Sequence, residues 1–136
     1  MRVILSSLVV ALLTVYSGGR METGILVTQA GPFSVNQVHE ICTPVAKTLG
    51  SVFPTVLTYG AHIPSFGHSW AYNIAFKQAT HLDVCEPEDI DAAIQHKLGA
   101  EAAEKLGWYD GLTHRSMFAL PKPVRAALAA ETRVVT

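Results

Sequence analysis

Residues 55–77 read TVLTYGAHIPSFGHSWAYNIAFK, and this stretch decides how the chain is interpreted. Residues 55–62 and 69–77 are both rich in β-forming side chains, and Trp70 begins a regular alternation of large and smaller residues in the second run. Between them, residues 63–67 contain a proline and a glycine, which is typical of a turn or loop. The stretch therefore predicts two antiparallel strands joined by a loop long enough to carry function.

A short apolar run, GILVTQ at residues 24–29, precedes this hairpin. Its continuous apolar character is typical of a strand buried on both faces, as in the parallel sheet of an α/β protein. The sequence Ala30-Gly31-Pro32 should end the strand.

A helix is expected between that strand and the hairpin. Ser34 is a good N-cap, Gly50 is a natural stop, and apolar residues recur at helical spacing over residues 35–49. Pro44 should kink or split this helix near Thr43, because proline lacks an amide hydrogen and clashes with the preceding turn.

The residues after the hairpin favour helices. Pro87 suits a helix start, and Gly99 suits the end of that helix. Residues 100–106 are expected to add a short turn, residues 108–111 a loop, and Pro121 should open a last helix.

The order of elements is thus strand, helix, strand, strand, helix, helix. This order fits the closing half of a doubly wound α/β sheet of the methyltransferase-like, Rossmann-type class, incomplete and ending in an antiparallel hairpin and helices. Other α/β domains share the order, so it leaves the function open.

Length and composition limit the interpretation further. The 136 residues are enough for one domain, and the high apolar content fits a globular core. The formal net charge of -1 gives no basic excess for nucleic acid. Cys42 and Cys85 do not form a CxxC motif, so two reduced thiols are expected, which favours a cytoplasmic location.

Residues 1–20 form a separate apolar N-terminal segment, whereas residues 21–136 hold the interpretable domain. The apolar run is shorter than the roughly 20 residues that a membrane span needs, so no membrane association is expected. A secretory signal peptide at residues 1–19, a buried strand or helix, and a mistaken reading-frame start before Met21 all fit this segment.

Three blocks of the sequence resemble a known family. They are GILVTQAGP at residues 24–32, VFPTVLTYGAHIPSFGHSW at residues 52–70 and WYDGLTHRSMFALPKPVRAAL at residues 108–128. In this order and spacing they resemble the C-terminal half of the polyamine aminopropyltransferases, the spermidine and thermospermine synthases. The closing Glu131-Thr132 is similar to the plant-type thermospermine branch.

The resemblance implies an activity for the family. An aminopropyl group moves from decarboxylated S-adenosylmethionine, the co-substrate, to an amine of a polyamine, and no metal is needed. The glycine-rich turn and the aspartate motif of the family have no counterpart before residue 24. We therefore expect no catalytic base and no bound cofactor in this chain, and no activity from it alone.

The resemblance also implies two substrate-binding residues. Gln29 ends its strand where ligands sit in open α/β sheets, so its amide should bond an ammonium, although it could merely cap the strand end. Trp70 should line the acceptor pocket and make a cation–π contact, although it could merely fill the core. Where many spermidine synthases carry a tyrosine, this chain has Ile63, as the thermospermine branch tolerates.

The histidines give no metal site by their spacing. His62 and His68 flank the loop, but no carboxylate or cysteine accompanies them at ligand spacing. His114 is expected to be structural. The expected partner is a polyamine, and a homodimer is compatible with the family. A non-catalytic binding or interaction module derived from the same family is the alternative interpretation.

Overall fold

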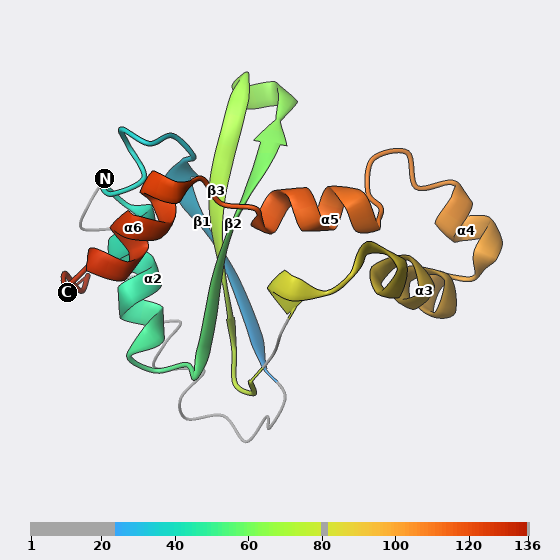
Figure 1. The fold of residues 1–136 in the computed structure, drawn as a ribbon, viewed down its shortest axis with the longest axis horizontal. Coiled ribbons are helices and arrows are strands. Elements are labelled where there is room, and N and C mark those ends of the chain that lie inside the picture. The colour runs from blue at the N-terminus through green and yellow to red at the C-terminus, as the bar shows by residue number, and fades with distance from the viewer. Residues whose placement is uncertain (1–23, 80–81, 136) are drawn as a thin grey trace. The chain divides into compact units, whose positions relative to one another are not determined.

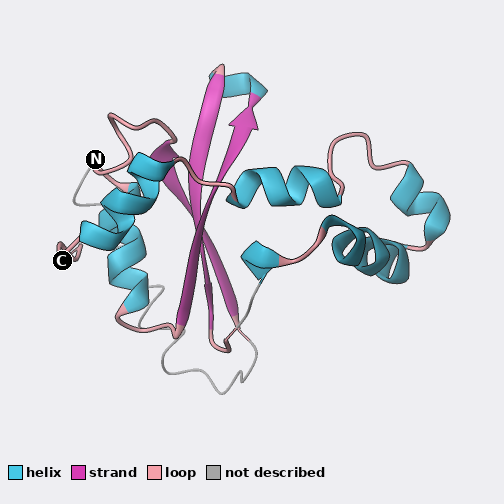
Figure 2. Ribbon diagram, in the orientation of Figure 1, coloured by secondary structure: helices cyan, strands magenta, loops and turns pink. Residues whose placement is uncertain are grey.

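The computed structural model describes residues 24–79 and 82–135. Over these residues the chain forms two compact units (Figures 1 and 2). The first unit combines the sheet with the C-terminal helix and tail, and the second consists of the helices between His81 and Leu120. The predictions for residues 1–20 lie outside the described residues.

The first unit is built on a three-stranded sheet. Strands β1 (Ile25–Pro32) and β2 (Thr55–Ile63) each pair antiparallel with β3 (His68–Phe76), which lies between them. β1 and β2 therefore run in the same direction, and helix α2 (Cys42–Gly50) connects them. The short helix η1 (Pro64–Phe66) joins β2 to β3, so the predicted hairpin with its loop is confirmed.

The expectation that residues 24–29 are buried on both faces is wrong. In β1 the side chains of Ile25 and Val27 are about half exposed, whereas Leu26 is buried. The strand also continues through Pro32 instead of ending at Gln29. The prediction failed because burial on both faces is typical of parallel sheets, whereas β1 pairs only antiparallel among the described strands. Helix α2 covers one face of β1 and leaves the other uncovered.

Helix α2 packs against the face of the sheet that carries Leu26, and the hydrophobic core lies between them. Val45 and Leu49 of α2 pack with Leu26 of β1, Ala75 of β3 and Phe53. The helix begins at Cys42, and residues 35–41 form turns, so Pro44 lies in the first helical turn, where its missing amide hydrogen costs little. The predicted helix start after Ser34 is therefore wrong, and the chain is helical only from Cys42, so no helix is split near Thr43.

The last helix returns to the first unit. α6 (Lys122–Ala130) begins just after Pro121, as predicted, and packs against α2 with Val124 buried. The tail that follows runs along α2 and carries the buried side chain of Glu131.

The second unit contains η2 (Leu82–Val84), α3 (Pro87–Leu98), α4 (Ala100–Glu104) and α5 (Gly111–Phe118). Pro87 starts α3 and Gly99 follows its end, as predicted. Helix α5 was missed, although Asp110 caps it by accepting a hydrogen bond from the amide of Thr113.

The fold of the described residues gives no sign of a membrane span. No helix in the described part of the chain is both long and apolar enough to cross a bilayer.

Candidate functional site

The two predicted site residues lie on one face of the sheet. Gln29 of β1 is opposite Tyr72 of β3, and Trp70 lies two residues before Tyr72, so the side chains of Gln29 and Trp70 share a face. Between Gln29 and Pro32 the register shifts by one residue, which is a β-bulge. Gly31 in the bulge has φ +85, a left-handed conformation that suits glycine.

Trp70 lies near the tip of the β2–β3 hairpin, against two other rings. Its ring centroid is 4.8 Å from that of Phe66 and 5.5 Å from that of His68. In the sheet Trp70 is opposite Ala61 on β2 and Pro32 on β1. The indole Nε1 is buried and has no hydrogen-bond partner among the described residues.

A pair of tyrosines continues the same face and was not predicted. Tyr59 of β2 is opposite Tyr72, and the two rings stack with centroids 5.2 Å apart and planes 13° apart. With Gln29 they form a row across the three strands. The alternation in residues 69–77 already placed Tyr72 on the face of Trp70, but the pairing register that brings in Tyr59 is not readable from the sequence.

The opposite face of the same strands is fixed by a buried polar cluster. The side chain of Asn73 is fully buried, donates to the carbonyl of Cys42 at 3.0 Å and accepts from the hydroxyl of Thr58 at 2.6 Å. Burial raises the pKa of the Cys42 thiol to about 11, so this cysteine stays protonated and is not a nucleophile. The cluster ties the start of α2 to the centre of the sheet.

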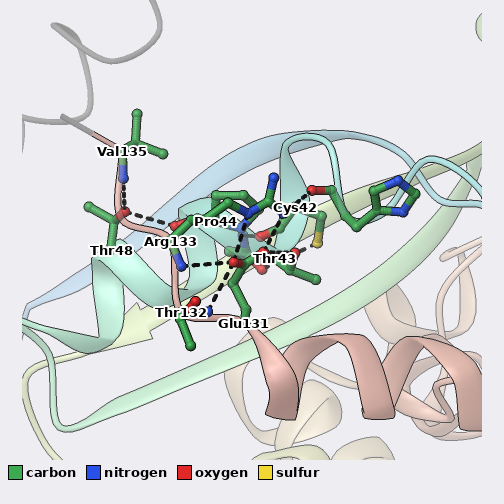
Figure 3. A network of polar contacts seen from close by, with 10 residues as sticks. Cys42, Thr43, Pro44, Thr48, Glu131, Thr132, Arg133 and Val135 are labelled. Carbon is green, nitrogen blue, oxygen red and sulfur yellow. Dashed lines mark hydrogen bonds and ion pairs between the residues drawn. The ribbon is translucent and has the colours of Figure 1, made fainter.

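The C-terminal tail is held on α2 by a buried carboxylate (Figure 3). Glu131 accepts hydrogen bonds from the hydroxyl of Thr43 and from the guanidinium of Arg133, whose Nη2 and Nε lie 2.6 and 2.9 Å from its two oxygens. The hydrogen bonds from Arg133 are the largest influence that holds the pKa of Glu131 well below its usual range.

The tail makes two further contacts that secure its path. Arg133 also donates to the carbonyl of His39 at 2.6 Å, and the amide of Val135 donates to the hydroxyl of Thr48 at 2.7 Å (Figure 3). These contacts act on α2 and on the turn before it, so they support the site from behind and do not line it.

His62 and His68 do not form a metal centre. In the β2–β3 ladder His62 is opposite Ser69 and His68 is opposite Ile63, so the two histidines point to opposite faces of the hairpin. Over residues 24–79 and 82–135, no three His, Cys, Asp or Glu side chains are grouped closely enough to hold a metal ion.

His114 is buried in the second unit, and both of its ring nitrogens are engaged. Nε2 donates to the carbonyl of Leu82 at 2.9 Å, which leaves Nδ1 to accept from the hydroxyl of Tyr109 at 2.6 Å. The ring therefore links α5 to η2 and to the loop before α5, which is a structural arrangement.

Comparison with known proteins gives sequence relatives over most of the chain. Thermospermine synthase ACAULIS5 of Arabidopsis thaliana is 32% identical over 111 residues, which is 82% of this chain and 31% of the relative. A polyamine aminopropyltransferase of Synechococcus is 32% identical over 83% of this chain and 35% of its own length. The chain thus spans about a third of these relatives, within their C-terminal part. No family model matches the chain.

Solved structures agree on the fold. The spermidine synthase of Thermotoga maritima matches with a TM-score of 0.56 and 20% identity, over 81% of this chain and 36% of that structure. A spermidine synthase in complex with the transition-state analogue AdoDATO matches with a TM-score of 0.56 and 18% identity, over 81% of this chain and 34% of that one. The expected methyltransferase-like fold class is therefore confirmed, as a part of that fold.

Proposed function

We propose that this chain forms the amine-binding wall of a polyamine aminopropyltransferase, the family whose C-terminal part it matches. The reaction transfers an aminopropyl group from decarboxylated S-adenosylmethionine to a polyamine. An uncharged amine attacks the carbon next to the sulfonium, the carbon–sulfur bond breaks, methylthioadenosine leaves, and the new ammonium loses a proton.

One observation carries this proposal. Gln29 and Trp70 share a face of the sheet at the end where β1 and β2 finish and β3 begins. Ligands of open α/β sheets sit beyond the carboxyl ends of the strands that run in parallel. In this position the amide of Gln29 is able to bond an amine, and the ring of Trp70 offers a flat surface to the methylene chain.

Other parts of the site are assigned to the portion of the relatives that this chain does not match. The catalytic base and the groups that hold the nucleoside belong there in this proposal. The partner of the described residues is the polyamine, and we further propose a homodimer and a cytoplasmic location.

Fragment complementation tests the function. The chain is mixed with a separately produced N-terminal part of the Synechococcus relative, and methylthioadenosine release is measured with decarboxylated S-adenosylmethionine and spermidine. Release that requires both polypeptides, and that falls at least tenfold with Gln29→Leu, is the expected result. Gln78→Leu is the matched control, since Gln78 is exposed beyond the opposite end of β3.

The same mixture distinguishes the proposed enzyme part from the alternative, a binding module without catalysis. In that case spermidine binds the chain with the same loss in the Gln29→Leu variant, but no methylthioadenosine appears under any mixing condition.

A further inference from the structure

Resting on the function proposed above, we propose that the indole N–H of Trp70 hydrogen-bonds an uncharged amine nitrogen of the polyamine. The site would then select the free-base form of the nitrogen at this position, and the affinity would depend on releasing its proton. This role differs from a cation–π contact, which favours the charged form.

The first support is the unpaired donor itself. Nε1 of Trp70 is buried without a partner among the described residues, and its neighbours across the sheet are Ala61 and Pro32. Neither of these side chains contains a hydrogen-bond acceptor. A buried donor left unpaired destabilises the protein, and such donors are uncommon in native structures. An acceptor brought by a ligand would remove this cost.

The second support is the chemistry of the donor. An indole nitrogen donates and cannot accept, and an ammonium also donates and has no lone pair. The two groups cannot form a hydrogen bond. An uncharged amine has one lone pair for Trp70 and N–H groups for an acceptor such as the amide oxygen of Gln29, which lies on the same face.

Access to the indole depends on the two rings that pack against it. Phe66 and His68 both lie against the ring, and both side chains are exposed. Gly67 between them has φ +70, and nothing lies within 4 Å of the position of an added Cβ. For a ligand to reach Nε1, these exposed side chains would have to reorient and uncover it.

The nitrogen held by Trp70 is not the attacking one, because its lone pair is engaged by the indole N–H. Trp70 thus holds a second nitrogen of the polyamine and is a positioning residue. A polyamine that enters as a polycation must give up one proton to solvent at this nitrogen when it binds.

The test uses the full chain with ¹⁵N-labelled tryptophan, which has two indole signals, one of Trp70 and one of Trp108. Spermidine should move the indole proton signal of Trp70 downfield. Fully methylated, quaternary spermidine has no lone pair and should not move it downfield. A Trp108→Phe variant assigns the signals and serves as the control substitution, since Trp108 is exposed in the second unit.

The affinity gives an independent readout. Below the pKa of the amine, one released proton makes the affinity rise about tenfold per pH unit. On the face of Trp70 the side chains with titratable groups are His68, Tyr72 and Tyr59, whereas His62 is on the other face. A His68→Asn variant should therefore keep the pH dependence. Trp70→Phe, which keeps a ring without the N–H, should lose it.

The outcomes separate the inference from the proposed function. Spermidine that binds with an unmoved Trp70 signal, or a quaternary analogue that moves the signal equally, overturns the inference alone. If spermidine does not bind at any pH, the proposed function fails together with it. The NMR measurement on the unsubstituted chain stands even if Trp70→Phe does not fold.

Discussion

Gln29 of β1 and Trp70 of β3 face the same side of the sheet across a β-bulge, with Gln29 opposite Tyr72 and Trp70 opposite Pro32. A bulge adds one residue to one strand and re-aims the side chains beyond it. The relation between these two side chains therefore depends on the backbone of Ala30 and Gly31, and not only on the pairing of β1 with β3.

Replacing Gly31 with alanine should disturb the site at modest cost to the fold. Gly31 has φ +85, where an L-residue is strained by about 1–2 kcal/mol, and the added Cβ would come within 3.4 Å of Ile41. We expect several-fold weaker spermidine binding, measured by calorimetry. Gly50→Ala is the control, because nothing lies within 4 Å of its Cβ position. Unchanged binding in Gly31→Ala would show that the bulge does not set the site.

Among the polar residues of the sheet, we expect replacement of Asn73 to lower the free energy of unfolding most. Asn73→Ala leaves the carbonyl of Cys42 and the hydroxyl of Thr58 without their buried partner, which should cost about 2 kcal/mol in the free energy of unfolding. Urea denaturation measures the loss, and Asn36→Ala, at an exposed asparagine, is the control. In a double-mutant cycle, Thr58→Val should lower the free energy of unfolding less in the Asn73→Ala background than in the unsubstituted chain. Strictly additive losses would argue against a coupling between Thr58 and Asn73.

The tail should detach as acid neutralises Glu131. A carboxylate whose pKa is lowered in the folded state stabilises it fully above its unfolded pKa. That contribution falls progressively as the pH drops below about 4.5, the ordinary value for glutamate. At neutral pH, Glu131→Gln should cost about 2 kcal/mol, the order of a charged hydrogen bond.

The difference in stability between Glu131→Gln and the unsubstituted chain should therefore shrink from pH 6 to pH 3. Denaturation midpoints at each pH measure it, with Glu40→Gln as the control at an exposed site. A difference that stays constant over this range would exclude the charge of Glu131 as the cause.

Gly111→Ala should unfold the helical unit. An added Cβ would lie 2.0 Å from the carbonyl oxygen of Pro87, which is backbone and cannot move aside easily. The shift would also strain the hydrogen bond from the amide of Gly111 to Asp91. We expect a loss of several kcal/mol or no stable second unit, followed through hydrogen exchange of residues 87–118. Gly107→Ala, with open space around it, should leave exchange unchanged.

Local signals in the sequence predicted most of the elements. The proline and glycine positions placed the starts of α3 and α6 and the end of α3, because these residues restrict the backbone in known ways. The alternation after Trp70 gave β3 within a residue. Helix α5 was missed because its apolar pattern is weak, and the Asp110 cap was interpreted as part of a turn.

Features that depend on pairing could not be predicted. The apolar run at residues 24–29 has the same composition whether one or both of its faces are buried, so the exposure of Ile25 and Val27 follows only from its partners. The bulge at Gly31 and the Tyr59–Tyr72 stack depend on the register of strands far apart in sequence. The candidate residues Gln29 and Trp70 came from a family resemblance, and their shared face is a result of that register.

The position of β3 between β1 and β2 also dictates an order of events during synthesis. Ile25 pairs with Phe76, about fifty residues later, whereas β2 and β3 meet through a loop of a few residues. Closing the short loop costs far less chain entropy, so the hairpin should form first and β1 should join it afterwards. On the ribosome, β1 would emerge early and wait for its only described strand partner until the last residues of β3 are made.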